Sequence, residues 1–153
     1  MNAVISSSGN WKEKIYEAYS AIADGRVTVA DTSAEVKSSN GAKTYTVTWE
    51  ENTYTSNDSA SYWQGYPGYP IIAVLMTQGK VTLDREVAAL FSGINWTEMN
   101  QQYKRDYSAV VEHIIKERDY DSTPIHAAAE KVQGELQELN VMVKRGKLRP
   151  PKG

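Results

Sequence analysis

Apolar residues near the start of the chain recur at the spacing of a helix that packs on one side. The residues of this face are Trp11, Ile15, Tyr19 and Ile22. They lie three or four positions apart, which places them along one side of a helix. Asn10 precedes the run and Gly25 follows it, as is typical of residues that cap the two ends of a helix. The pattern predicts one N-terminal helix.

From residue 26 to residue 56 the pattern changes to an alternation of apolar and polar positions. It is clearest in "KTYTVTW", where Tyr45, Val47 and Trp49 alternate with threonines. A period of two indicates a strand with one buried face. The pair Asn40-Gly41 and the segment "WEENTY" supply turns between strands. We expect an antiparallel meander of three to four strands, with its apolar face against helices and its threonine face in water.

The second half of the chain returns to helical spacing. A helix is predicted to begin at Pro70, whose missing N–H costs nothing in a first turn, and to end at Gly79. A second is expected before Gly93, and Asn95 with Glu98 three residues later indicates the start of a third. Two long apolar faces follow, one of Trp96, Met99, Tyr103, Tyr107, Val110 and Ile114 and one of Ile125, Ala129, Val132, Leu136 and Leu139. We therefore predict an α+β fold: an N-terminal helix, a small antiparallel β-meander, and a helical C-terminal half of three to four helices.

The composition excludes several kinds of site. The 153 residues include no cysteine, so the chain has no disulfide, thiolate nucleophile or cysteine-based zinc site. His113 and His126 have no partner at a metal-ligand spacing, and Glu50 and Glu51 are interpreted as solvated charges of a turn. Neither a nucleophile–base pair nor a phosphate-binding glycine loop is present. We expect a protein that is not an enzyme and that uses no metal or cofactor.

Basic residues are concentrated at the C-terminal end. Residues 144–153, "KRGKLRPPKG", hold Lys144, Arg145, Lys147, Arg149 and Lys152, whereas all nineteen acidic residues lie earlier in the chain. We divide the chain into one α+β domain, residues 1–143, and a basic tail, residues 144–153. The tail is either a solvated end or an arm that contacts phosphates, and the sequence leaves both open. The longest apolar run, residues 71–76, is too short to span a membrane.

One stretch of the chain resembles a known module. It reads "TSNDSASYWQGYPGYPIIAVLM", from Thr55 to Met76, and it completes the predicted hairpin "KTYTVTWEENTYTS". Over residues 34–79 the hairpin, the aromatic loop and the apolar helix resemble the SWIM zinc finger. That family places two cysteines one residue apart after a hairpin, then a cysteine and a histidine one residue apart at the start of a helix. The matching positions in this chain are Ser56, Asp58, Gly68 and Pro70.

The resemblance concerns the frame and not the metal. Gly68 and Pro70 have no side-chain donor, so four-coordinate zinc is excluded at these positions. Four aromatic side chains of the loop bring large apolar areas that can offset the stabilisation a structural zinc provides. They are Tyr62, Trp63, Tyr66 and Tyr69. These residues are interpreted either as buried substitutes for the ion or as an exposed patch for a partner, and the sequence leaves this open.

The resemblance to the SWIM family implies binding to DNA or to other proteins. The expected function is a non-enzymatic, nucleic-acid-associated or adaptor module with a metal-free SWIM-like core, located in the cytoplasm. The expected nucleic-acid contacts are the five basic residues of the tail together with Lys104 and Arg105. The alternative is a self-assembling structural subunit located in the virion, such as a nucleoprotein or capsid protein of an archaeal virus. Ten tyrosines and four tryptophans suit such contacts between copies.

Overall fold

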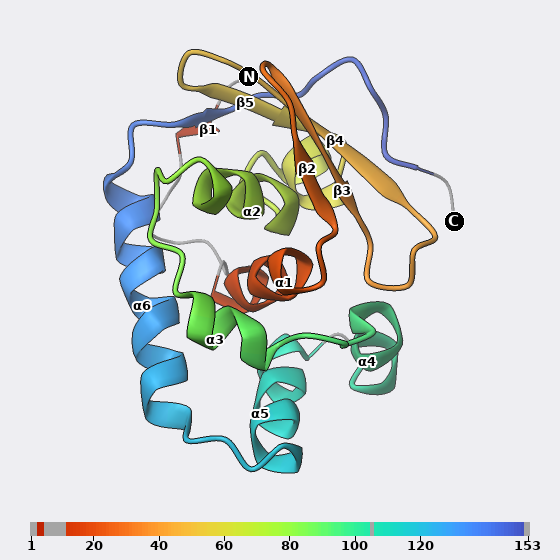
Figure 1. Cartoon of the computed structure of the whole chain (residues 1–153). Coiled ribbons are helices and arrows are strands. Elements are labelled where there is room, and N and C mark those ends of the chain that lie inside the picture. Colours follow the sequence, from red (N-terminus) through yellow and green to blue (C-terminus); the bar gives the residue numbers. More distant parts are fainter. Residues whose placement is uncertain (1–2, 5–11, 105, 152–153) are drawn as a thin grey trace.

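A six-stranded sheet forms one layer of the fold, and α2 and then α1 lie beneath it (Figure 1). The structure is a computed structural model that describes residues 3–4, 12–104 and 106–151. The strands are β1 (Ala3–Val4), β2 (Val27–Val29), β3 (Ser33–Lys37), β4 (Thr44–Glu50), β5 (Thr53–Ser56) and β6 (Met142–Val143). The helices are α1 (Lys12–Ala23), the short π-helix η1 (Ala60–Gln64), α2 (Tyr69–Thr77), α3 (Arg85–Leu90), α4 (Trp96–Gln102), α5 (Tyr107–Glu117) and α6 (Ser122–Glu138). The predicted α+β fold is confirmed: α1 precedes the meander, and α3 to α6 make up the helical second half.

The consecutive strands β2 to β5 form the antiparallel meander that the alternating pattern predicts. Gly41 has a φ of 74° between β3 and β4, in the turn where a positive φ favours glycine. β6 lies parallel to β5 and antiparallel to β1, so the strand order is β1-β6-β5-β4-β3-β2. β1 and β6 have two residues each, which is too short for a sequence pattern. Segments near both ends of the chain thus extend the predicted sheet.

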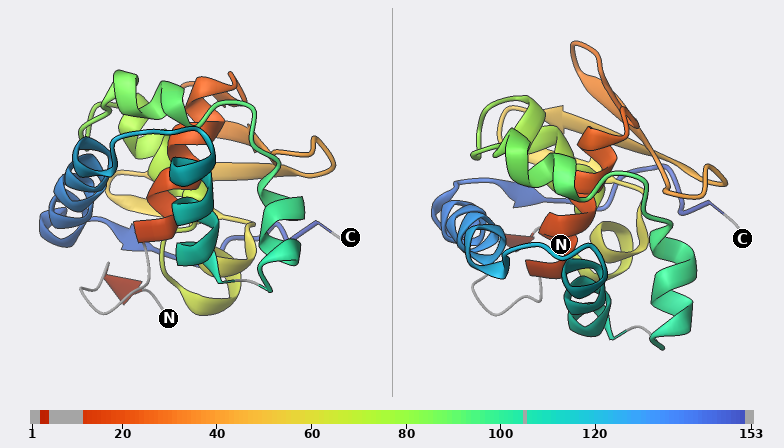
Figure 2. Two further views of the ribbon diagram at one scale, coloured as in Figure 1. Left: turned by 90° about the horizontal axis from the view of Figure 1, so that it is seen from below. Right: turned by 60° about the horizontal axis from the view of Figure 1, so that its bottom comes forward.

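The apolar face predicted from Trp96 to Ile114 is divided between α4 and α5. Lys104 has a φ of 51° after α4, and the Asp106 carboxylate accepts a hydrogen bond from the Ala109 N–H at 3.2 Å. An aspartate that caps free N–H groups in this way begins a new helix. Figure 2 shows α4 set to one side of α5. Apolar spacing continues across the break, so the periodicity alone indicates a single helix.

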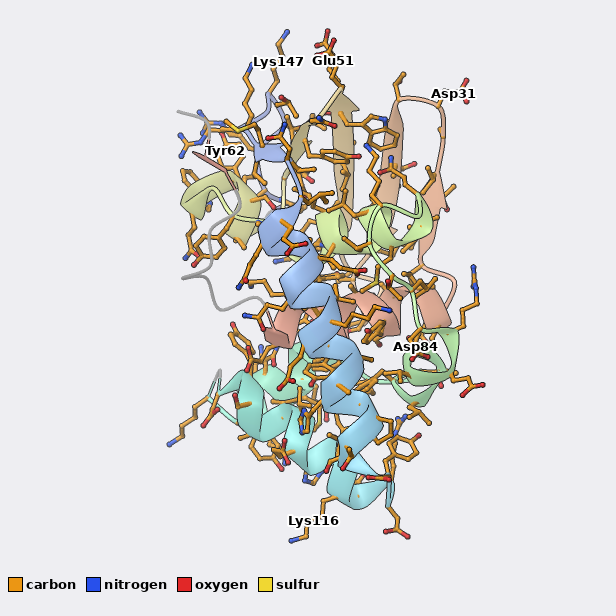
Figure 3. All side chains as sticks on the ribbon, turned by 90° about the vertical axis from the view of Figure 1, so that its left-hand side faces the viewer. Asp31, Glu51, Tyr62, Asp84, Lys116 and Lys147 are labelled. Atoms are coloured by element: carbon orange, nitrogen blue, oxygen red, sulfur yellow. The ribbon has the colours of Figure 1, made fainter. Side chains whose placement is uncertain are left out.

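The threonine face of the β4–β5 hairpin is partly covered. Thr48 and Thr55 lie opposite each other, and their hydroxyls form a hydrogen bond. The chain that follows β6 passes beside them, and a Cβ added to Gly146 would lie 3.1 Å from the Thr55 Cβ. In Figure 3 Lys147 of this segment lies at the same end of the molecule as Glu51 of the hairpin turn. The expectation that this face meets water therefore holds only in part, because a C-terminal segment packs on it.

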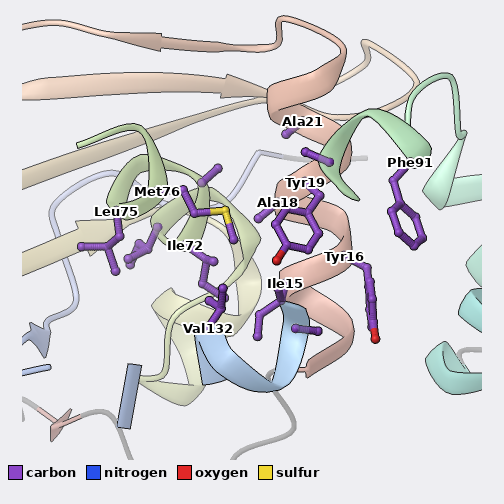
Figure 4. Close-up of a cluster of buried hydrophobic side chains, with 14 of the residues drawn as sticks. Ile15, Tyr16, Ala18, Tyr19, Ala21, Ile72, Leu75, Met76, Phe91 and Val132 are labelled. Atoms are coloured by element: carbon purple, nitrogen blue, oxygen red, sulfur yellow. The ribbon is translucent and has the colours of Figure 1, made fainter. Parts of the chain in front are cut away.

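α2 lies in the centre of the core, which explains why its sequence is apolar on every side. All residues from Pro70 to Met76 are buried, and an all-apolar helix is stable in water only when it is enclosed. Figure 4 shows the cluster that encloses it, including Ile15, Ala18 and Tyr19 of α1, Ile72, Leu75 and Met76 of α2, and Val132 of α6. Each fully buried aliphatic side chain contributes about 1.5–3 kcal/mol. The start of α2 therefore fixes the end of the aromatic loop firmly against the core.

Candidate functional site

Three of the four positions that the resemblance singles out lie together in the fold. The Ser56 hydroxyl donates a hydrogen bond of 2.5 Å to Asp58 Oδ1, and the other carboxylate oxygen accepts the Ser61 N–H at 3.1 Å. The Ser61 hydroxyl in turn accepts the Gly68 N–H at 3.0 Å. A Cβ added to Gly68 would lie 1.9 Å from Asp58 Oδ2, so the carboxylate takes the space of a side chain at residue 68. We call Ser56, Asp58, Ser61 and Gly68 the polar cluster.

The fourth position, Pro70, is buried in the first turn of α2. Within the described residues no three His, Asp or Glu side chains are grouped so that they could hold a metal ion. His113 Nε2 lies 2.9 Å from a Glu117 oxygen, and His126 Nε2 lies 3.1 Å from a Glu112 oxygen. Each histidine is thus paired with a carboxylate on the helical half, away from the aromatic loop.

The four aromatic side chains of the loop differ in how far they are buried, so neither interpretation from the sequence covers all of them. Tyr62 is buried, whereas the neighbouring Trp63 on η1 is 59% exposed. Tyr66 and Tyr69 are partly buried and pack against the core. The Tyr69 ring also meets the Tyr45 ring edge to face, with centroids 6.1 Å apart. Three tyrosines therefore serve the packing of the loop, and Trp63 is the residue available to a partner.

Residues 144–149, which we call the basic strap, are attached to the sheet along their length. The Lys144 N–H donates to the Tyr54 carbonyl at 2.8 Å, and the Asn57 amide donates to the Arg149 carbonyl at 3.2 Å. All four basic side chains of the strap remain exposed: Lys144, Arg145, Lys147 and Arg149. The backbone contacts therefore fix where these cations lie without neutralising them.

Arg145 connects the strap to the aromatic loop. Its Nε donates to the Tyr62 carbonyl at 2.9 Å. Its guanidinium lies 4.8 Å from the centroid of the Tyr62 ring and 5.2 Å from that of the Trp63 ring. Cation–π contacts at such distances contribute about 0.5–1 kcal/mol each at exposed sites. Arg145 thus joins the basic strap to the exposed aromatic residue of the loop.

A groove of about 580 Å³ runs between the strap and the outer face of the hairpin. Threonine hydroxyls line its floor, and Lys144, Arg145 and Lys147 line its wall, with Glu50 as the acidic residue among them. Hydroxyl and cationic donors of this kind hydrogen-bond to phosphate oxygens. The groove is therefore chemically suited to an anionic backbone.

The other predicted contacts are less closely connected to this surface. Lys104 is exposed after α4, and α4 and the C-terminal segment lie on the same side of the molecule (Figures 1 and 2). Arg105 and Lys152 lie outside the described residues. The structure thus places four tail residues near Trp63. Lys104 lies on the same side of the molecule but is not part of this surface.

A polar pocket of about 460 Å³ lies beside the polar cluster, and no motif in the sequence predicts it. Its walls come from segments far apart in the chain: Glu17 of α1, Tyr45 of β4, Asp58 of the cluster, and Trp96 and Asn100 of α4. Burial raises the pKa of Glu17 to about 7, although Lys14, a hydrogen bond from Asn100 and Arg26 act to lower it. In the sequence Glu17 is an ordinary polar position of an amphipathic helix, because only the fold brings these walls together.

The sequence model of one protein family, described as uncharacterised conserved protein UCP014422, matches residues 9–142. The chain belongs to this family. No curated protein and no solved structure matches it significantly.

The span matched by the UCP014422 family contains the polar cluster and every wall of the polar pocket, and it ends before the basic strap. Among the described residues, no helix is both long and apolar enough to cross a membrane. The described chain thus presents two candidate binding surfaces: the exposed strap with Trp63, and the polar pocket.

Proposed function

We propose that this chain is a non-enzymatic module that binds single-stranded nucleic acid, with the basic strap on the phosphates and Trp63 against a base. The observation that carries the proposal is the position of Arg145, a strap residue that hydrogen-bonds to the Tyr62 carbonyl and lies against the ring of the exposed Trp63. Proteins that bind single strands combine a cationic groove with aromatic side chains on which bases stack. The strap, its groove and Trp63 supply both parts on one surface.

The distribution of charge supports an oriented contact. The strap places four exposed cations within six residues, whereas the whole chain has a formal net charge of −2. An acidic body repels phosphates, so an anionic strand approaches most favourably at the strap. Because the strap is attached to Tyr54, Asn57 and Tyr62, little backbone conformational entropy is lost when the cations meet a ligand.

The direct test is the fluorescence anisotropy of a labelled single-stranded DNA titrated with variants. The double variant K147Q/R149Q removes two strap cations, and we expect at least about hundredfold weaker binding, since each hydrogen bond to a charged group contributes about 1.5–3 kcal/mol and each 1.4 kcal/mol is about tenfold in affinity. The matched control K116Q/K131Q removes two exposed lysines of α5 and α6. Figure 3 shows Lys116 at the opposite end of the molecule from Lys147. Equal losses in the two double variants, or no binding by the wild type, would contradict the proposal.

Self-assembly is the second candidate, favoured by the outer edge of β2, where no other strand of the described residues pairs. This strand is the last of the sheet on its side, and Val29 at its end is 37% exposed. An open edge strand can pair with a strand of another copy. Light scattering of the wild type and of V29K tests self-assembly. We expect the wild type to form a larger species and V29K to be monomeric, and a wild type that is monomeric at high concentration would contradict self-assembly.

A further inference from the structure

Two residues that line the polar pocket carry buried polar atoms that have no partner within the described chain. The Trp96 side chain is 3% exposed, and its indole Nε1 has no hydrogen-bond acceptor. The Asn100 Oδ1 on the same helix is also buried without a donor. Leaving such a group unpaired costs about 1–3 kcal/mol. A bound molecule that pairs with these atoms would recover that cost.

The charged groups of the pocket differ in how far they are already engaged. The Asp58 carboxylate accepts hydrogen bonds from Ser56 and Ser61. The Arg26 guanidinium donates to the Lys37 carbonyl at 2.6 Å and lies 3.6 Å from an Asp24 oxygen. Asp58 is therefore held by the protein itself, and Arg26 is held in part, because its buried Nε has no hydrogen-bond partner among the described residues.

Two lysines remain available to a ligand. The Lys14 ammonium lies 5.9 Å from the centroid of the Tyr107 ring. Lys43 is partly buried, and no carboxylate in the described part of the chain pairs with its ammonium. Partly buried cations beside an unpaired N–H donor attract an anion with acceptor oxygens.

We propose that the polar pocket binds a small oxyanion-bearing ligand, a phosphate or carboxylate compound, whose anionic group lies among Lys14, Lys43 and the Trp96 indole N–H. The pocket volume of about 460 Å³ suits a small metabolite. Asn100 Oδ1 accepts a hydroxyl or amine proton of the same ligand. This inference concerns a different surface from the strap and stands independently of nucleic-acid binding.

Glu17 makes the binding depend on pH. Burial has the largest effect on the pKa of Glu17 and raises it, and Asp58 raises it further. Lys14, a hydrogen bond from Asn100 and Arg26 lower it. With a pKa of about 7, the carboxyl is about nine-tenths protonated at pH 6 and about one-tenth at pH 8. A neutral carboxyl does not repel an anion and can donate to it. Anion binding therefore takes up a proton, and affinity rises as the pH falls.

The test is an NMR titration that follows the Trp96 indole N–H resonance, assigned through Trp96→Phe. The probes are inorganic phosphate and citrate, which represent the two oxyanion classes, with glucose as a neutral control. We expect saturable shifts of the Trp96 resonance with at least one anion and none with glucose. Lys43→Met should weaken that binding about tenfold, whereas Lys37→Met, an exposed lysine of β3, should leave it unchanged. No saturable shift with either anion, or equal losses in both lysine variants, would overturn the proposal.

A sulfate titration isolates the role of Glu17, because sulfate keeps its charge between pH 6 and pH 8. We expect the wild type to bind sulfate about tenfold more tightly at pH 6, in proportion to the protonated fraction of Glu17. Glu17→Gln mimics the protonated form, so its affinity should not change with pH. An equal pH dependence in the wild type and in Glu17→Gln would remove Glu17 from the site.

Discussion

The polar cluster and the basic strap both border the end of β5, but they expose their polar groups to very different degrees. Ser56, Asp58 and Ser61 of the cluster are 1–6% exposed and hydrogen-bond to one another. The strap holds its backbone against the sheet and leaves its cationic side chains in water. Changes in the cluster should therefore alter folding stability, and changes in the strap should alter binding.

The strongest test of the cluster is to place metal ligands at the four positions that the resemblance to the SWIM family singles out. The variant S56C/D58C/G68C/P70H removes the Asp58 carboxylate that takes the space beside Gly68. We expect one zinc ion per chain, with a structural site of this kind contributing about 10–16 kcal/mol of apparent binding free energy. The zinc content after dialysis measures how many ions are bound per chain, and the absorption spectrum of the cobalt-substituted variant reports the coordination of the metal.

The control is S56C/D58C, which supplies two ligands and should bind zinc far more weakly. A four-residue variant that folds but binds no zinc would show that these positions share a neighbourhood without the geometry of a metal site.

A single added methyl group should also disrupt the cluster. In Gly68→Ala the Cβ would lie 1.9 Å from Asp58 Oδ2, and we expect a loss of about 3 kcal/mol in the free energy of unfolding. The matched control is Gly134→Ala in α6, where a Cβ meets nothing within 4 Å and should stabilise the helix by about 1 kcal/mol. Urea denaturation of both variants measures the difference. Equal stability of wild type and Gly68→Ala would mean that the cluster is loosely packed.

Glu17 extends the comparison to the pocket beside the cluster. Its pKa is about 7 in the folded chain against 4.5 ordinarily, so the folded state holds an extra proton between these values. The free energy of unfolding therefore falls as the pH rises through this range, by up to about 3 kcal/mol. Glu17→Gln should stabilise the protein at pH 8 and change little at pH 4. Thermal unfolding of the wild type and of Glu17→Gln between pH 4 and pH 8 measures this difference in stability. An effect of the substitution that does not change with pH would contradict the burial of the Glu17 charge.

The smallest effect on stability is expected at Trp63. Its side chain is 59% exposed, so Trp63→Ala should change the free energy of unfolding by no more than about 0.5 kcal/mol beyond the loss of the Arg145 contact. The same variant should weaken binding to single-stranded DNA by about 1–3 kcal/mol if a base stacks on the ring. A large loss of stability with unchanged affinity would place Trp63 with the packing residues.

The parts of the fold that could be predicted are those specified by local patterns. Asn95 caps α4 through the Glu98 N–H, and the alternation around Val47 becomes β4, as expected. The break at Lys104 could not be predicted, because the apolar spacing continues across it. The position of β6 beside β5 could not be predicted either, because these two strands pair across a long stretch of sequence. The polar pocket could not be predicted for the same reason as the position of β6, since Glu17 and Trp96 come together only in the folded chain.

The sequence shows where the basic residues are concentrated but not how the fold holds the segment that carries them. Lys144 and Arg149 are attached to the hairpin through backbone groups, which have no sequence signature. Trp63 and Tyr62 are adjacent in sequence and their rings meet edge to face, with centroids 4.7 Å apart, yet Trp63 is exposed and Tyr62 is buried. Exposure of an aromatic residue in an irregular loop depends on tertiary packing.

The salt dependence of binding tests the central claim, that the strap holds phosphates, most directly. The affinity for a labelled single-stranded DNA is measured from low to moderate salt for the wild type and for K147Q/R149Q. Each phosphate contact on a single strand contributes about 0.7 to the slope of log affinity against log salt. We predict that the double variant lowers the magnitude of this slope by about 1.4, while K116Q/K131Q leaves it unchanged. An identical slope for the wild type and K147Q/R149Q would contradict the account.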